Sequence, residues 1–147
     1  MEELAMAKPR RFFLTFALCV AIAAFAGFPA SAAQPTVEII ALTHSPVRDA
    51  LKPVRNFLGT VTGQVKVVEL NSESPEGEKR IAAVGLKGHV PILLLINGSH
   101  RFKRSDGAVV EFKDFPAKAN NPLGLNGTWT VADFETAIKA ALGTAGK

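Results

Sequence analysis

The first clear pattern along the chain is a change in the spacing of its apolar residues. The run from Val37 to Leu42 is mostly apolar and predicts a β-strand. From Val47 to Val61 the apolar residues recur every three or four positions, which predicts a helix with one buried face. Ser45 and Pro46 precede this helix, and we expect the serine hydroxyl to cap it. The segment from Gln64 to Leu70 alternates in part and predicts a second strand.

A short helix and a strongly apolar strand are predicted next. The segment that begins at Ser74 places its apolar residues on one side and predicts a helix that ends near Gly85 or Gly88. Consecutive apolar residues then follow Pro91 and are closed by the turn residues Asn97-Gly98. A strand that is apolar on both faces is typical of the centre of a covered sheet.

The last third of the chain predicts a hairpin and a final helix. Two strands, His100–Arg104 and Ala108–Lys113, are separated by Ser-Asp-Gly and predict the hairpin. A long stretch without periodicity then runs from Asp114 to Trp129, and we expect its tryptophan to be a core residue that anchors the last helix. This helix is expected to be capped by Thr130 and stopped by Gly143.

The N-terminal segment has the layout of an export signal. The basic stretch 8–11 precedes an apolar run, Phe12 to Phe28, that contains no charged residue, and small residues follow at 30–33. This order matches the charged, apolar and cleavage-site regions of a secretory signal peptide, and the apolar run is short for a membrane-spanning helix. We therefore predict that residues 1–32 are a cleaved signal peptide.

The export signal also carries a prediction about location. Residues 10–14, Arg-Arg-Phe-Phe-Leu, match the twin-arginine consensus, which in bacteria exports proteins that are already folded. We expect a periplasmic or secreted bacterial protein whose remaining residues, 33–147, form one domain. A contact with the membrane is expected only through the signal peptide, if it stays uncleaved.

Cysteine and charge content exclude several classes of function for this domain. The single cysteine, Cys19, lies within the apolar run, so residues 33–147 contain no disulfide, thiolate metal ligand or cysteine nucleophile. Three of the 17 basic residues and two of the 13 acidic ones lie in the first 32 positions, so the domain has 14 against 11 and a net charge of +3. This charge is too small to predict a nucleic-acid partner.

The predicted order of elements, together with two short stretches, resembles the thioredoxin-like superfamily. The order is strand, helix, strand, helix, strand, hairpin and helix. Members of this superfamily carry a C-x-x-C motif at the start of the first core helix and a proline five residues after its second cysteine. The resemblance implies an α/β thioredoxin-like fold in which a central mixed four-stranded sheet is flanked by helices.

The resemblance also locates the position of the missing redox motif. When Pro53 is aligned with the helix proline of the family, Ser45-Pro46-Val47-Arg48 stands where the family has Cys-x-x-Cys. Thiol–disulfide exchange requires a thiolate that attacks a sulfur and a second thiol that resolves the mixed disulfide. Serine and arginine cannot supply either group, so we expect the domain to be redox-inactive.

The second stretch that carries the resemblance is His-Val-Pro-Ile-Leu-Leu-Leu-Ile-Asn-Gly, residues 89–98. It is similar to the family's cis-proline and the central strand that follows it. The resemblance implies that Pro91 is a cis-proline lying against the turn at Ser45. It also implies that the backbone of Val90 pairs with an extended substrate.

These residues suggest a binding groove rather than a catalytic centre. We expect the groove to be lined by His44, Ser45, Pro46, Val47, Arg48, Val90 and Pro91. The leading hypothesis is a non-catalytic module that binds an exported protein or an extended peptide, or that assists assembly, with no cofactor and no metal. Arg48 and the start of the helix would set a charge preference.

Three other readings of the sequence remain open: a pocket for an anion or a metal, an enzyme, and a structural subunit. Ser45, Arg48, His44 and His89 can form a pocket for a carboxylate or phosphate, and His44 with His89 can begin a metal site, although two histidines are a weak signal. Glutathione transferases share the fold and often use a serine at this turn, so a glutathione- or small-anion-binding enzyme is the alternative function. In the third reading the protein is a structural subunit whose interface is the loop 114–129.

Overall fold

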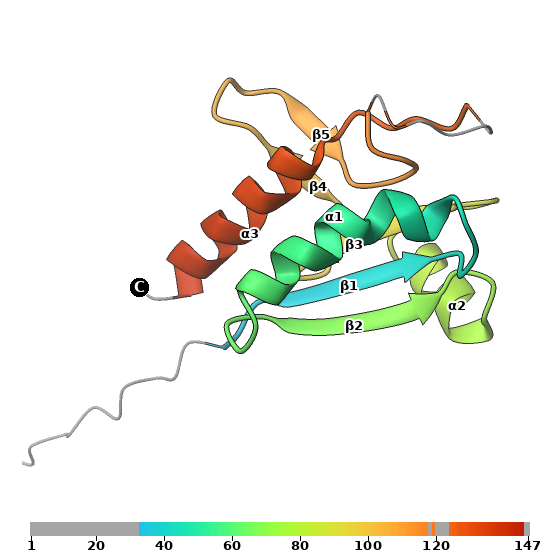
Figure 1. Ribbon diagram of the computed structural model, residues 1–147, viewed down its shortest axis with the longest axis horizontal. Coiled ribbons are helices and arrows are strands. Elements are labelled where there is room, and N and C mark those ends of the chain that lie inside the picture. Colours follow the sequence, from blue (N-terminus) through green and yellow to red (C-terminus); the bar gives the residue numbers. More distant parts are fainter. Residues whose placement is uncertain (1–32, 118, 120–123, 146–147) are drawn as a thin grey trace, which may run out of the picture. The chain divides into compact units, whose positions relative to one another are not determined.

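A computed structural model describes residues 33–117, 119 and 124–145 (Figure 1). The predicted signal peptide, residues 1–32, lies outside the described residues, and so does part of the loop 114–129. No helix in the described part of the chain has the length and apolar character needed to cross a membrane.

The described domain contains helices and strands in the predicted order. They are β1 (Thr36–Ala41), α1 (Val47–Thr60), β2 (Lys66–Asn71), α2 (Pro75–Ala83), β3 (Ile92–Ile96), β4 (Arg101–Lys103), β5 (Val109–Glu111) and α3 (Val131–Ala145). The predicted α/β class is therefore confirmed.

The main sheet is mixed and has the strand order β2-β1-β3. β1 and β2 are parallel, and β3 runs antiparallel to β1, so that Ile40 pairs with Leu70 on one side and with Leu93 on the other. β4 and β5 form a separate two-stranded antiparallel sheet. The expected four-stranded sheet is thus replaced by a three-stranded sheet and a hairpin.

The chain just after β5 joins the hairpin to the main sheet. The backbone N–H of Leu94 donates to the carbonyl of Phe112 at 2.8 Å, and the N–H of Asp114 donates to the carbonyl of Ile92 at 2.8 Å. Asp114 has a φ of 62°, in the left-handed region, where the regular pairing of a strand stops. These two bonds cover the outer edge of β3, and residues 92–95 are fully buried. The predicted central position of this strand is wrong, because β1 is the central strand and β3 lies at the edge of the three-stranded sheet.

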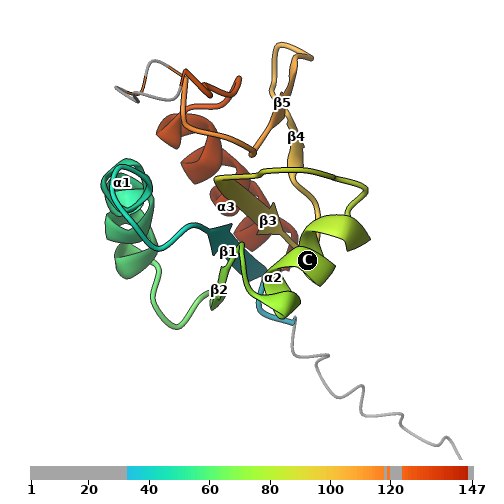
Figure 2. The same cartoon turned by 90° about the vertical axis from the view of Figure 1, so that its right-hand side faces the viewer.

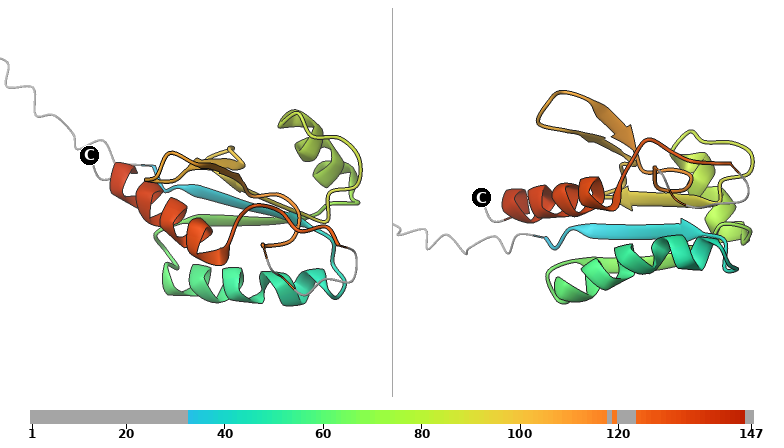
Figure 3. Two further views of the ribbon diagram at one scale, coloured as in Figure 1. Left: turned by 90° about the horizontal axis from the view of Figure 1, so that it is seen from above. Right: turned by 45° about the horizontal axis from the view of Figure 1, so that its top comes forward.

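The two faces of the main sheet are covered differently (Figures 2 and 3). Figure 2 shows α1 and α2 on opposite sides of the sheet, and the left view of Figure 3 shows α3 on the same side as α1. Alternate residues of β1 point to opposite faces. Val37 and Ile39 belong to the large core under α1 and α3, whereas Ile40 belongs to a small core under α2.

Trp129 is a fully buried core residue, as predicted. Its Nε1–H lies 3.1 Å from the carbonyl of Lys113 and 3.3 Å from that of Asp114. Its ring meets the ring of Phe112 edge to face, with 5.9 Å between the centroids. The tryptophan thereby fixes the start of α3 to the chain that follows β5.

The predicted start of α3 is confirmed and its predicted end is wrong. The Thr130 Oγ1 accepts from the N–H of Asp133 at 3.2 Å, and the Asp133 carboxylate accepts from the N–H of Thr130 at 2.8 Å, which is a reciprocal capping box. The helix continues past Gly143 to Ala145. A glycine inside a helix costs only about 1 kcal/mol relative to alanine, and Leu142 still packs against the large core.

The α2 helix begins as predicted and lies very close to the preceding turn. The Ser74 hydroxyl caps it by accepting from the N–H of Gly77 at 3.1 Å. A Cβ atom at Gly77 would overlap the carbonyl group of Asn71. The glycine therefore allows the first turn of α2 to pack directly on the end of β2.

Candidate functional site

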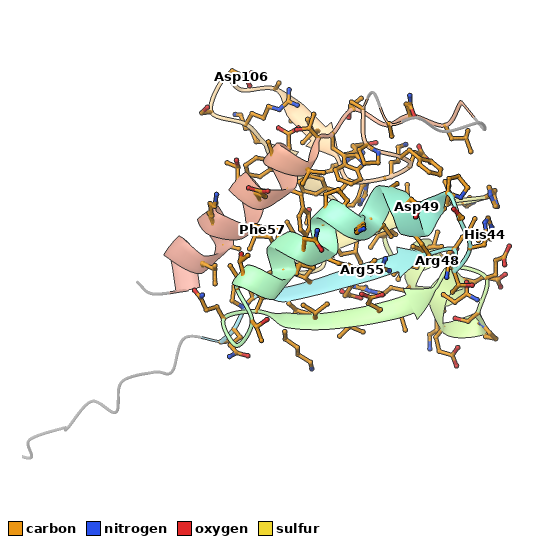
Figure 4. The ribbon with its side chains drawn as sticks, in the orientation of Figure 1. His44, Arg48, Asp49, Arg55, Phe57 and Asp106 are labelled. Atoms are coloured by element: carbon orange, nitrogen blue, oxygen red, sulfur yellow. The ribbon has the colours of Figure 1, made fainter. Side chains whose placement is uncertain are left out.

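The turn between β1 and α1 starts beside Pro91. The backbone N–H of Leu42 donates to the carbonyl of Pro91 at 3.1 Å, which continues the pairing of β1 with β3 and brings Pro91 beside the residue three positions before Ser45. Figure 4 shows His44, Arg48 and Asp49 at the N-terminal end of α1. The carbonyl of His44 accepts from the N–H of Arg48 at 3.2 Å, which closes the turn.

The predicted capping role of Ser45 is wrong. Pro46 occupies the N-cap position of α1, and no side chain accepts a hydrogen bond from the first helical N–H groups. The Ser45 hydroxyl instead donates to the carboxylate of Asp49 at 2.5 Å. The carboxylate lies in the first turn of α1, where a negative charge is favoured by the helix dipole.

This bond bears on the anion-pocket reading. A hydroxyl proton that is given to Asp49 is not available to a thiolate or phosphate, and the nearby carboxylate repels an anion. The Nδ1 of His44 lies 2.8 Å from the carbonyl oxygen of Ser45, so this ring nitrogen is engaged within its own turn. Arg48 is exposed and has no ion-pair partner within the described residues, so its guanidinium is the one free cationic group of the turn.

The prediction of a cis peptide bond before Pro91 is wrong. Among the described residues the cis bond is the one between Ser45 and Pro46. Most peptide bonds that precede proline in folded proteins are trans, and the sequence around Pro91 contains nothing that selects the cis isomer. Pro91 is buried and accepts a hydrogen bond from the N–H of Leu42, and its contact with the turn at Ser45 stays a prediction.

Val90 has the property that strand-like recognition requires. No backbone hydrogen bond involves it within the described residues, although Pro91 immediately after it is paired. Its side chain is only 9% exposed and belongs to the small core under α2. The three residues before it, 87–89, are exposed and are not in a helix or strand.

The structure divides the predicted groove residues among separate depressions. Pro46 lines a cavity of about 500 Å³ together with Ala50, Pro53 and part of the loop 114–129. Arg48 lines one of about 310 Å³ between α1 and β2. Val90 lines the largest, of about 560 Å³, on the α2 side of the sheet. Val47 is fully buried in the large core and belongs to none of them.

The cavity next to Val90 contains a residue that the sequence analysis missed. Ser72, in the turn between β2 and α2, is 6% exposed, and its Oγ is buried without a hydrogen-bond partner within the described residues. Its neighbour Ser74 is the helix cap. Both serines lie in one short polar segment, and no sequence pattern separates the buried one from the capping one.

A second buried polar atom lies near the C-terminal end of α2. The Nε2 of His100 has no partner within the described residues, and this histidine lines a cavity of about 360 Å³ with Arg101, the last residue of α2 and the residues that follow it. Burial lowers the pKa of His100, which favours the neutral imidazole.

The described residues do not contain a cluster of three or more His, Cys, Asp and Glu side chains that could hold a metal ion. The pair of His44 and His89 is thus not supplemented by the third ligand that a metal site needs.

Comparison of the chain with protein-family models, with curated proteins and with solved structures returned no match.

Proposed function

We propose that this chain is an exported, redox-inactive thioredoxin-like protein that binds an extended peptide or protein segment and performs no catalysis. The strand order β2-β1-β3, with β1 and β2 parallel and β3 antiparallel, supports the thioredoxin-like part of the proposal. The bond between Leu42 and Pro91 supports it as well, because it brings the proline before β3 close to the start of the turn that precedes α1.

The observation that carries the binding function is the unpaired backbone of Val90. Most backbone N–H and C=O groups in folded proteins are hydrogen-bonded, so a residue beside a cavity whose backbone groups lack a partner within the described residues can offer them to a ligand. An extended segment that lies along residues 87–90 supplies the partners in the manner of an added strand. Peptide backbone would then provide the affinity, and side chains that enter the cavity would provide the specificity.

Peptide selection followed by backbone modification tests this proposal. Peptides are selected from a random library on the purified protein, and the tightest binder is remade with one N-methylated amide at a time. Because a paired strand uses every second amide, alternate N-methylations should abolish binding and the others should not. Hydrogen exchange at the Val90 amide should slow when the peptide binds, while the exposed Val109 amide should be unchanged.

Two results would contradict the proposal. One is a selected peptide whose binding protects amides elsewhere and leaves Val90 unchanged. The other is a failure of every selected peptide to bind with a Kd below about 1 mM, which corresponds to about 4 kcal/mol of binding free energy.

The export part of the proposal is tested by the mature N-terminus. Cleavage after the small residues at 30–33 predicts a chain that begins near Ala33. Mass spectrometry of the protein recovered from the periplasm measures this directly. A chain that retains residues 1–32 and stays in the cytoplasm contradicts export.

The free guanidinium of Arg48 is the observation that favours the alternative, a glutathione- or small-anion-binding enzyme. The bond between Ser45 and Asp49 counts against it. Calorimetric titration with glutathione, on the protein and on Arg48→Ala, separates the two functions. Saturable binding of glutathione that is lost in Arg48→Ala would favour the glutathione- or small-anion-binding enzyme over the peptide-binding proposal.

A further inference from the structure

The cavity next to Val90 is built from three parts of the chain on the α2 side of the sheet. It is walled by the turn after β2, by α2 and by the segment that leads into β3. Its lining residues are Ser72, Glu73, Glu78, Ile81, Ala82, Leu86, Lys87, Gly88, His89 and Val90. Its volume of about 560 Å³ lies within the usual range of ligand sites, which begins near 300 Å³.

The inner wall of the cavity is apolar apart from one hydroxyl. Ile81 and Val90 are 5% and 9% exposed and pack together in the small core. Ser72 is only 6% exposed, and its Oγ has no hydrogen-bond partner within the described residues. A buried hydroxyl that is left unsatisfied costs about 1–3 kcal/mol, so a ligand that pairs with it recovers that free energy.

The rim of the cavity is negatively charged although the domain as a whole is basic. Glu73 and Glu78 are exposed, and neither forms an ion pair within the described residues. Lys87 is the one Lys or Arg among the lining residues, so the two glutamates and this lysine together carry a net charge of −1. A cationic group at the rim therefore meets two free carboxylates.

We infer that this cavity binds an arginine or lysine side chain of the bound segment. The aliphatic part of that side chain lies against Ile81 and Val90, and its cationic end lies between Glu73 and Glu78. An N–H of that end donates to the Ser72 Oγ, which has almost no accessible surface, once this side chain rotates towards the cavity. This inference rests on the proposed peptide binding, since the cavity lies next to the unpaired backbone of Val90. It adds a preference for basic residues at a cavity separate from the depressions beside α1.

A pair of small probes tests the cavity without any peptide. n-Butylguanidinium carries the aliphatic stem and the charge, and n-butylurea has nearly the same shape without the charge. Amide NMR shifts of Ser72, Ile81 and Val90 are followed as each probe is added to the purified protein. We expect saturable shifts with the guanidinium and at least tenfold weaker binding of the urea.

Three variants identify the groups that bind the probe. Glu78→Gln should weaken the binding of n-butylguanidinium by about threefold to fivefold, as is usual for the loss of one exposed charge pair. Glu76→Gln is the matched control, because Glu76 is an exposed α2 residue that does not line the cavity. Ser72→Ala should weaken the probe by a similar factor. It should leave the Tm unchanged or raise it, because it removes an unsatisfied buried group.

Each outcome decides the inference. Equal binding of both probes, or the absence of a saturable shift, would overturn the inference. A Ser72→Ala variant with a lower Tm and unchanged affinity for the probe would also overturn it, because the hydroxyl would then be structural. Selected peptides that bind with no preference for arginine over its neutral analogue citrulline would overturn it while peptide binding itself stands. Conversely, n-butylguanidinium binding without any peptide binding would keep the cation site and refute the proposed function.

Discussion

The two faces of the main sheet differ in how they are stabilised. The face under α1 and α3 buries four large aromatic side chains, Trp129, Phe112, Phe115 and Phe134. Phe112 contacts Trp129 and Phe134 edge to face, at 5.9 and 5.7 Å between ring centroids. The face under α2 is covered by nine helical residues, and its core consists of aliphatic side chains, Ile40, Ile81, Val90, Leu93 and Leu95.

The two faces differ in the size of their cores, although both border depressions. The aromatic face, under α1 and α3, has the larger core, and the depressions lined by Pro46 and by Arg48 lie beside α1. On the aliphatic face α2 is attached by the ion pair of Arg80 with Glu38, both of whose hydrogen bonds are 2.6 Å long, and by the close approach at Gly77. The cavities lined by Ser72 and by His100 both border this short helix and the residues that follow it. Stability therefore resides mainly on one face, and the candidate binding site lies on the other.

The largest expected effects test this division directly. Trp129→Ala should lower the free energy of unfolding by about 3–5 kcal/mol, because it empties a fully buried site and leaves two backbone carbonyls without their donor. Ile81→Ala should cost about 2 kcal/mol, at the low end for such a change, because the adjacent cavity lets the site relax. Urea denaturation measures both, and a loss at Ile81 equal to that at Trp129 would contradict the division.

The fold was largely predictable because its elements have strong local patterns. The apolar run before Asn97, the spacing of three and four in α1, and the Ser-Asp-Gly turn each specify one element without help from the rest of the chain. The division of the expected sheet was not predictable. It depends on Asp114 adopting a positive φ and on Phe112 bonding both to β3 and to the hairpin, and these contacts join residues far apart in sequence.

The candidate site was less predictable than the fold. The resemblance suggested Val90 and its neighbour Pro91, and their binding role stays a prediction. The sequence could not show that Ser45 bonds to Asp49 rather than capping α1. It also could not show which serine of the turn after β2 is buried. Burial and hydrogen bonding of a polar side chain depend on the packing of distant elements, so Ser72 was found only from the structure.

The next prediction compares the ion pair that attaches α2 with an exposed one. Arg80 and Glu38 have side chains 32% and 14% exposed, whereas Arg55 and Glu69 form a similar pair between α1 and β2 at 37% and 48%. Arg80→Met should destabilise the protein by about 1–3 kcal/mol, because it leaves a mostly buried carboxylate unpaired. Arg55→Met should change stability by less than about 0.5 kcal/mol, because exposed pairs contribute little.

Denaturation at low and high salt checks this comparison. The effect of Arg80→Met should persist in about 1 M NaCl, because a mostly buried carboxylate is poorly screened, and that of Arg55→Met should disappear. If the two substitutions are equivalent, the pair with Glu38 is not what attaches α2 to the sheet.

Acid sensitivity is expected at the start of α3. The guanidinium of Arg104 lowers the pKa of Asp133 to about 2, and the bonds from Thr130 add to this effect. Because the folded-state pKa lies below the unfolded value, the stabilisation is fully present above about pH 4 and is lost as the pH falls towards 2. We expect a loss of about 1–2 kcal/mol over this interval, reduced by solvent screening.

The comparison of Arg104→Gln with the unchanged protein isolates this contribution. In the variant an NMR titration should show a higher pKa for Asp133, and the difference in stability between pH 5 and pH 2.5 should shrink. The sensitivity would have to be assigned to other carboxylates if the variant kept the full pH dependence.

The smallest expected effect concerns the two helix starts on the aromatic face. Thr130→Ala should cost about 1 kcal/mol, because the threonine completes the capping box of α3. Ser45→Ala should cost less than about 0.5 kcal/mol, since its exposed hydroxyl bonds to Asp49 and leaves the first N–H groups of α1 without a side-chain acceptor. Thermal unfolding of both variants at pH 7 measures the difference.

A cost at Ser45 as large as that at Thr130 would mean that the serine stabilises α1 in solution. A negligible cost, together with unchanged peptide binding, would leave the turn with neither a structural nor a binding role and would place recognition on the α2 side of the sheet.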